Sequence, residues 1–234
     1  MNSGSGKRIW DDDGALRAAL REAAEELGLG LPEPDGQWGR LAEYLGAGNG
    51  RGVVVSPPGN GRRTFDVRLR LNGTPLASGG TSDLAKAARA VAAWTGGVGL
   101  EETRARDSFI KYRPWALAHE REPFDKVELT WLVKLDRIHS APFSRHPRAH
   151  AVLAAAYAQP VLRALMPVNS HYNLWFSSTI KEPWKAKVGY VLCPYDEGLY
   201  GVWSRGELIA RTETAEEAVA LVVAALPEGT GPAS

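Results

Sequence analysis

The sequence predicts an α+β fold that consists of two similar units, each an antiparallel sheet covered by helices. The main observation is a repeat, because the segment from Asn72 to Trp94 (NGTPLASGGTSDLAKAARAVAAW) resembles the segment from Arg205 to Leu226 (RGELIARTETAEEAVALVVAAL). Both segments place a turn and a strand-like pattern before a helical pattern. Matching residues follow one constant offset without a gap, and they are Gly73 and Gly206, Leu76 and Ile209, Thr81 and Thr214, Ala85 and Ala218, Ala88 and Leu221, and Ala92 and Ala225.

The first unit begins with a predicted helix that ends at Gly28, a residue that commonly terminates helices. Its apolar stripe consists of Leu16, Ala19, Leu20, Ala23, Ala24 and Leu27. The residues from Val53 to Val55 then predict a short buried strand. After it, Phe65, Val67, Leu69 and Leu71 alternate with polar residues, which is the pattern of a half-buried strand.

A hairpin and a helix complete this unit. Asn72-Gly73 is a strong signal for a two-residue turn, and residues 75–78 (PLAS) form the returning strand. Thr81 is predicted to cap a helix that reaches Trp94.

The second unit repeats this order. Pro147 is expected to open a helix that ends near Ala156, and Gln159-Pro160 starts a short extra turn that ends at Met166. Strands are predicted from Ser170 to Thr179, from Val188 to Leu192 and around Tyr200 and Val202. Thr214 and Glu217 form a capping box that begins the last helix.

These elements divide the chain into a first repeat over residues 1–100, a connecting segment over 101–146 and a second repeat over 147–234. Within the connecting segment, Val127 to Leu135 (VELTWLVKL) has the composition of a strand. Each unit has a free sheet edge that a twin can protect, so we expect a pseudo-twofold relation between the two units.

The composition excludes several classes of function. The net charge of +1 gives no argument for nucleic acid or anionic membranes as partners. Cys193 is the only cysteine, so we expect no intramolecular disulfide and no cysteine-based zinc site. No apolar stretch resembles a signal peptide or a membrane span. The sequence therefore predicts a cytoplasmic protein, and it contains no fingerprint of a nucleotide, metal or other cofactor.

The segment from Ser170 to Thr179 (SHYNLWFSST) supplies the main candidate site. If it is one strand, His171, Asn173, Trp175 and Ser177 share one face. Such a face would suit a ligand, with His171 as a proton carrier and Tyr172 completing the wall. A polar strand face or a subunit contact is the alternative that this pattern also allows.

Glu120 and Glu128, in the connecting segment, are the candidate carboxylate partners of His171. Their separation along the sequence fixes no distance in space, and an isolated glutamate is more often a surface residue. Most tryptophans are expected in the core, and any exposed one would suit a site for a peptide or a small molecule. The tryptophans considered are Trp38, Trp94, Trp115, Trp131, Trp175, Trp184 and Trp203.

Three segments of the chain resemble an actinobacterial family with a domain of unknown function (domain of unknown function 6193). They are residues 155–183 (AAYAQPVLRALMPVNSHYNLWFSSTIKEP), the block from Gly73 to Trp94 and the ending EEAVALVVAALPEGTGPA. The resemblance extends from about Val53 to Ala233, and its most specific part is a pattern formed by Ser170, His171, Leu174, Phe176 and Ser177. Members are often labelled natural product biosynthesis proteins, which implies a role with a ribosomally made peptide.

From the residues and this resemblance we expect a cytosolic tailoring or accessory protein that binds a peptide-like intermediate, alone or with a biosynthetic partner enzyme. If it is an enzyme, its chemistry would be cofactor-free acid/base catalysis. The alternative is a non-catalytic partner protein: a peptide chaperone, a leader-recognition module or an immunity-like protein, because a free sheet edge can accept an added strand.

Overall fold

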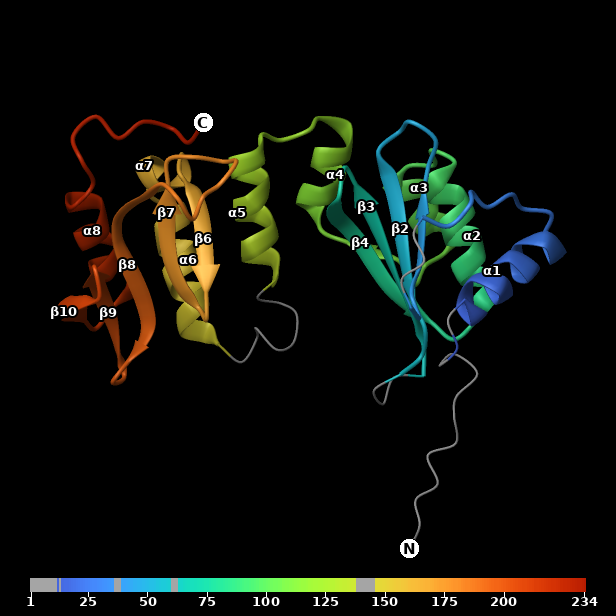
Figure 1. Ribbon diagram of the computed structural model, residues 1–234, viewed down its shortest axis with the longest axis horizontal. Helices are drawn as coiled ribbons and strands as arrows, with labels where there is room; N and C mark the ends of the chain where they lie inside the picture. Colours follow the sequence, from blue (N-terminus) through green and yellow to red (C-terminus); the bar gives the residue numbers. More distant parts are fainter. Residues whose placement is uncertain (1–11, 13, 36–38, 60–62, 138–145) are drawn as a thin grey trace, which may run out of the picture. The chain divides into compact units, whose positions relative to one another are not determined.

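The computed structural model describes residues 12, 14–35, 39–59, 63–137 and 146–234, and it divides into two compact units, Met1–Pro123 and Phe124–Ser234 (Figure 1). Each unit contains one five-stranded antiparallel sheet and helices, which confirms the predicted α+β class. Trp38 lies outside the described residues.

The first unit places its strands in chain order, β1-β2-β3-β4-β5. Its elements are α1 (Ala15–Glu26), β1 (Ala42–Leu45), β2 (Arg51–Ser56), β3 (Phe65–Leu71), β4 (Thr74–Thr81), α2 (Leu84–Thr95), α3 (Leu100–Arg106), β5 (Lys111–Tyr112) and α4 (Pro114–Arg121). Helix α2 packs on β2 and β3, and α1 packs against α2. The predicted helical stripe is confirmed for Leu16, Leu20, Ala23 and Ala24, which are buried, whereas Leu27 at its end is 41% exposed.

The second unit has the order β10-β9-β8-β7-β6. Its elements are α5 (Lys126–Arg137), α6 (Pro147–Tyr157), α7 (Pro160–Arg163), β6 (Met166–Ser170), β7 (Asn173–Ser177), β8 (Lys187–Asp196), β9 (Leu199–Ser204), β10 (Glu207–Thr212) and α8 (Ala215–Ala224). The core contains Trp131, Leu174, Phe176, Leu192 and Val202. Helices α5, α6 and α8 pack on this side of the sheet, and Figure 1 shows α6 behind β6 and β7.

One hairpin in each sheet has the same turn type and the same bulge position. The turns between β3 and β4 and between β9 and β10 each consist of two residues with positive φ, Asn72-Gly73 (48° and 79°) and Arg205-Gly206 (49° and 87°). A bulge follows at the same distance from each turn, at Leu76 and at Ile209. Left-handed residues at both turn positions match the twist of the strands, which is why glycine recurs at the second position.

Residues 127–135 are helical, so the predicted strand there is wrong. Helix α5 begins after Asp125, whose Oδ1 accepts hydrogen bonds from the N–H groups of Val127 and Glu128 at 2.8 and 3.0 Å. Val127 and Trp131 are buried at a helical spacing of four residues. The β-branched and aromatic composition misled the prediction, since packing on the sheet outweighs propensity.

Two further predictions need correction. The cap of α2 is Asp83, whose Oδ1 accepts from the N–H groups of Ala85 and Lys86, while Thr81 Oγ1 accepts from the Asp83 N–H at 3.1 Å. His171 lies outside β7, because His171 and Tyr172 form a two-residue turn between β6 and β7, with φ of 47° and 72°. The predicted single strand is therefore the end of one hairpin strand, its turn and the next strand.

Candidate functional site

Glu120, a predicted acid or base, lies near the end of α4 in the first unit. Its Oε1 accepts a hydrogen bond from Arg51 Nη2 at 2.9 Å, and both carboxylate oxygens accept from the Leu100 N–H, at 3.2 and 3.0 Å. The Arg51 guanidinium also lies over the Trp94 ring, 4.1 Å from its centroid. The carboxylate thus connects β2, α3 and α4.

Glu128, the second predicted carboxylate, lies in the first turn of α5 in the second unit. Its Oε1 accepts from the Tyr157 hydroxyl at 2.5 Å and from Arg163 Nη2 at 2.7 Å, and its Oε2 accepts from Arg163 Nε at 2.9 Å. Burial, followed by the hydrogen bond to Glu128, raises the pKa of Tyr157 to about 12. The hydroxyl is therefore a donor at neutral pH, and the network connects α5, α6 and α7.

His171 is exposed at the turn between β6 and β7, where Ser170 Oγ lies 3.1 Å from its Nδ1. The neighbouring Tyr172 belongs to an aromatic cluster. Its ring centroid is 4.0 Å from that of His146 and 6.1 Å from that of Tyr195, and His146 and Tyr195 are 5.8 Å apart. His146 precedes α6 as its N-cap, the position that the sequence predicts for a residue before Pro147.

Within the second unit, the structure does not bring His171 and Glu128 together. Glu120 belongs to the first unit, whereas Glu128 and His171 belong to the second. Within the second unit, Glu128 contacts Arg163, which precedes β6, and His171 follows the other end of β6. A strand of this length spans roughly 15 Å, so Glu128 and His171 lie at opposite ends of it.

The predicted alternation of residues along β7 is confirmed. Leu174 and Phe176 are fully buried in the core, and Asn173 and Trp175 are partly exposed on the opposite face. Ser177 also points away from the core but is buried, and its Oγ donates to the Ala186 carbonyl at 3.0 Å. Asn173 and Trp175 are thus the part of the predicted wall that a ligand can reach.

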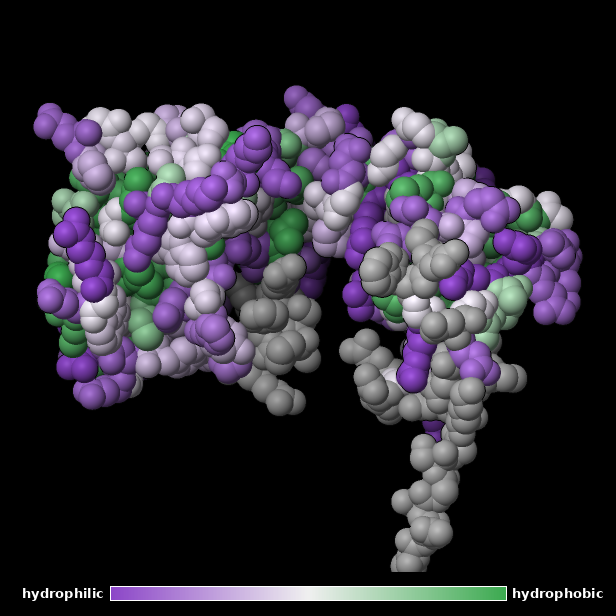
Figure 2. Space-filling view, in the orientation of Figure 1, coloured by the Kyte–Doolittle hydropathy of each residue, from purple (hydrophilic) through white to green (hydrophobic). Residues whose placement is uncertain are grey.

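Trp175 is one member of an apolar row that crosses the sheet on the face opposite the helices, here called the open face. Residues that lie opposite each other in antiparallel strands share a face of the sheet. Val168 is opposite Trp175. Trp203 has Val191 opposite it on one side and Leu208 on the other. All five side chains are partly exposed, and none belongs to the core. Figure 2 shows this face as a pale area of intermediate hydropathy over β7 and β8.

The sequence prediction missed Trp203, Val191, Val168 and Leu208 as members of this row, and it placed most tryptophans in the core. Trp94 and Trp131 are indeed fully buried. The sequence nevertheless indicated which way Trp203 points. The strand pattern predicts that Val202 is buried, and neighbouring residues of a strand point to opposite faces, so Trp203 faces away from the core.

The Trp203 indole lies over Gly201. A Cβ at Gly201 would be 2.6 Å from Trp203 Nε1 and 2.7 Å from Asp196 Oδ2, so only glycine leaves room for both. Trp203 Nε1 is buried and has no hydrogen-bond acceptor among the described residues. Asp196 Oδ2 instead accepts from Arg211 Nε at 3.0 Å.

The corresponding face of the first sheet is charged. Arg68 and Arg70 on β3 occupy the positions that Gly201 and Trp203 hold on β9, by the offset of the sequence repeat. Arg68 pairs with Asp66 at 2.7 Å, and Arg70 pairs with Glu43 at 3.1 Å. The two units therefore share strand order but differ in the chemistry of this face.

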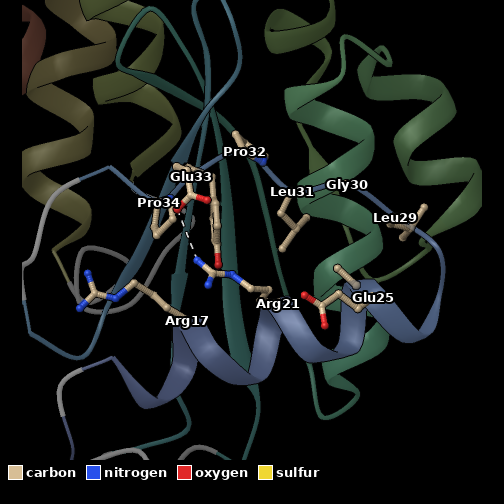
Figure 3. Close-up of a pocket in the computed structure, with 11 residues that line it drawn as sticks. Arg17, Arg21, Glu25, Leu29, Gly30, Leu31, Pro32, Glu33 and Pro34 are labelled. Carbon is tan, nitrogen blue, oxygen red and sulfur yellow. Dashed lines mark hydrogen bonds and ion pairs between the residues drawn. The ribbon is translucent and has the colours of Figure 1, made fainter.

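The first unit contains two cavities beside residues 28–34. One, of about 290 Å³, lies between α1 and the segment 29–34, where the Arg21 guanidinium pairs with Glu33 at 3.3 Å (Figure 3). Tyr44 lines it, and burial, opposed by Arg21 and Arg17, raises the pKa of Tyr44 to about 12.

The other cavity, of about 350 Å³, is lined by Arg89, Ala92, Val98 and Asp107, among others. Asp107 Oδ1 accepts from Arg89 Nη2 at 3.2 Å, and Oδ2 is buried with no hydrogen-bond partner among the described residues. Burial raises the pKa of the Asp107 carboxyl. Within the described ranges, no group of three or more His, Cys, Asp or Glu side chains is arranged to hold a metal ion, and none of the described helices has the length and apolar character of a membrane span.

The fold defines an α+β protein whose second unit presents a partly exposed apolar row on its open face. Residues 125–234, which are almost all of that unit, match the model of a family described as a family of unknown function (DUF6193). The predicted resemblance is thereby confirmed for these residues, and the block from Gly73 to Trp94 lies outside the match. No curated protein and no solved structure matches the chain.

Proposed function

We propose that this protein is an accessory or tailoring component of natural product biosynthesis that holds a peptide or peptide-like intermediate on the open face of its second sheet. One observation carries the proposal: Val168, Trp175, Val191, Trp203 and Leu208 form a partly exposed apolar row across the strands. Rigid indole rings bind apolar side chains with little loss of conformational entropy. The biosynthetic setting, with a ribosomally made peptide and a partner enzyme, is the expectation attached to the family resemblance.

Binding accounts for the geometry better than acid/base catalysis does. Both predicted carboxylates are held by arginines, Glu120 by Arg51 and Glu128 by Arg163, and Glu128 lies at the far end of β6 from His171. A catalytic pair requires hydrogen-bond reach, directly or through one water. Cofactor-free chemistry at His171, and a chaperone, leader-recognition or immunity-like role, remain predictions.

We also infer that the two units descend from a duplication. The constant sequence offset, the paired left-handed turns and the bulges at Leu76 and Ile209 support this inference. The equivalent positions Arg70 and Trp203 differ, so the two copies have diverged in the chemistry of this face. The pseudo-twofold relation between the units remains a prediction.

The test is co-elution of the wild-type protein with the precursor peptide encoded beside its gene, followed by mass spectrometry of the peptide. We expect the peptide to co-elute with unchanged mass, and Trp175→Ala to reduce the bound fraction about tenfold. Trp184→Ala is the matched control, because Trp184 is 66% exposed in the loop between β7 and β8, outside the row.

Equal binding by the Trp175→Ala and wild-type proteins, with circular dichroism showing both folded, would refute the binding face. A mass change that His171→Ala abolishes would instead establish the predicted acid/base enzyme.

A further inference from the structure

The two sheets differ at one edge. Strand β4 pairs with β3 on one side and with β5 on the other, through Ala77 opposite Tyr112 and Ser78 opposite Lys111. Strand β10 has the same place in the hairpin of the second unit, but it ends its sheet. Among the described residues, the main chain of 207–212 has no hydrogen bond outside its pairing with β9.

The second residue after each hairpin turn is proline in the first unit, Pro75, and leucine in the second, Leu208. Pro75 is opposite Arg70, and Leu208 is opposite Trp203. In a two-residue hairpin the pair beside the turn exchanges hydrogen bonds, and the main-chain groups of the next pair point away from the partner strand. Pro75 therefore presents no outward donor, whereas Leu208 presents both an N–H and a C=O.

The bulge residues differ in exposure. Leu76 is 4% exposed and belongs to the same core cluster as Ile110, the residue before β5. Ile209, at the equivalent bulge, is 47% exposed. The second unit therefore retains an apolar side chain at the position that the first unit covers with its own chain.

We propose that the outer edge of β10, residues 207–211 (the β10 edge), binds an extended segment of a partner polypeptide as an added antiparallel strand. An apolar side chain of the segment would cover Ile209, whose counterpart Leu76 is buried in the core cluster that contains Ile110. The segment carries basic residues beside this apolar side chain. Leu208 belongs to the open face through its side chain, whereas this inference concerns its outward main chain and the Ile209 side chain, so it stands apart from the proposed function.

Charge supports the choice of a basic segment. Glu207 is exposed at the start of β10, and no ion pair engages it among the described residues. Arg211, near the other end, is engaged by Asp196 and Glu197 at 3.0 and 3.2 Å, so its charge is offset. Opposite charges across neighbouring strands are stabilising. The segment that occupies the β4 edge also has this character, with Lys111 and Arg113 after Ile110.

The added strand should leave the edge at Thr212. The equivalent residue of the first unit is Gly79, where a Cβ would be 2.1 Å from the Phe109 carbonyl oxygen. Thr212 carries that Cβ, so a segment cannot follow the path of residue 109 beyond Arg211. This limits the contact to the residues between Glu207 and Arg211.

The experiment uses a fluorescent peptide with the sequence of residues 108–115 (SFIKYRPW) and measures its anisotropy with the full chain. We expect saturable binding that Leu208→Pro weakens about tenfold, because the outward N–H is lost. Leu208→Ala keeps the N–H and is the matched control, with an expected loss of less than about threefold. Pro75 shows that the hairpin accepts proline at this position.

A peptide with glutamate at both basic positions should bind at least about tenfold more weakly, and Trp175→Ala should leave the affinity of the original peptide unchanged. Equal affinities of the Leu208→Pro and Leu208→Ala proteins, or no saturable binding by the wild-type protein, would overturn the β10 edge as a binding site. Neither result would affect the co-elution test of the open face, since that test depends on Trp175.

Discussion

Replacing Glu120 by alanine tests whether this carboxylate has a structural task. The side chains of Arg51 and Glu120 are only 14% and 10% exposed, and the carboxylate also accepts from the Leu100 N–H at the start of α3. If Glu120 acts structurally, its removal should destabilise the first unit. If it acts only as an acid or base, stability should change little.

The expected loss follows from what remains after the substitution. Removing one partner of a buried ion pair costs about 3–5 kcal/mol, because the other charge stays buried. Arg51 retains its hydrogen bond to the Val98 carbonyl, at 2.6 Å, and its contact with the Trp94 ring. We therefore expect a decrease of about 3 kcal/mol in the free energy of unfolding of the first unit.

The control is Glu101→Ala, because Glu101 and Arg121 also connect α3 and α4, at 2.6 Å. Their side chains are 60% and 65% exposed, so this pair should contribute less than about 1 kcal/mol. Hydrogen exchange with mass spectrometry reports the opening free energy of each unit separately. A loss for Glu120→Ala below about 1 kcal/mol, or equal to that of Glu101→Ala, would refute the structural assignment.

Three further predictions concern individual side chains. Folding raises the pKa of Tyr44 from 10.0 to about 12. The stability that Tyr44 contributes is therefore complete below pH 10 and is lost as the pH rises through 12, by about 2–3 kcal/mol. Urea denaturation at a series of pH values should show this loss, and Tyr44→Phe should remove it. Gly201→Ala should lower the melting temperature, with a loss of about 1–3 kcal/mol, because the new Cβ meets the indole of Trp203 and the carboxylate of Asp196. Trp203→Phe removes a buried N–H that has no acceptor among the described residues, and the Trp203 side chain is partly exposed, so urea denaturation should show a loss well below the about 3–5 kcal/mol that truncation of a fully buried aromatic residue costs.

Much of the fold could be predicted from local patterns. The stripe of α1, the Asn72-Gly73 turn and the capping box of Thr214 and Glu217 are confirmed, since each depends on interactions within a few residues. The predicted strand at 127–135 failed because its composition favours strands, while its burial is decided by contacts with α6 and β6. Asp125 followed by Val127 and Trp131 at helical spacing was the signal that identifies α5.

The sequence could predict only those parts of the candidate site in which the residues belong to one strand. Alternation along β7 placed Asn173 and Trp175 on one face. Val168 lies opposite Trp175, and Val191 opposite Trp203, through strand pairings that no local pattern specifies. His171 was assigned to a strand because a turn of two non-glycine residues with positive φ is uncommon. Its place at a hairpin tip follows from the pairing of β6 with β7.

The chain-ordered strands also bear on how the protein folds. Every strand pairing within each sheet joins strands adjacent in the sequence. The loops that must close are therefore short, except between β4 and β5, which α2 and α3 separate. The core of the first unit is complete by α4, before any residue of the second unit is needed. During synthesis the amino-terminal unit can therefore fold while the ribosome is still translating the carboxy-terminal one, which keeps the two similar hairpins from exchanging strands.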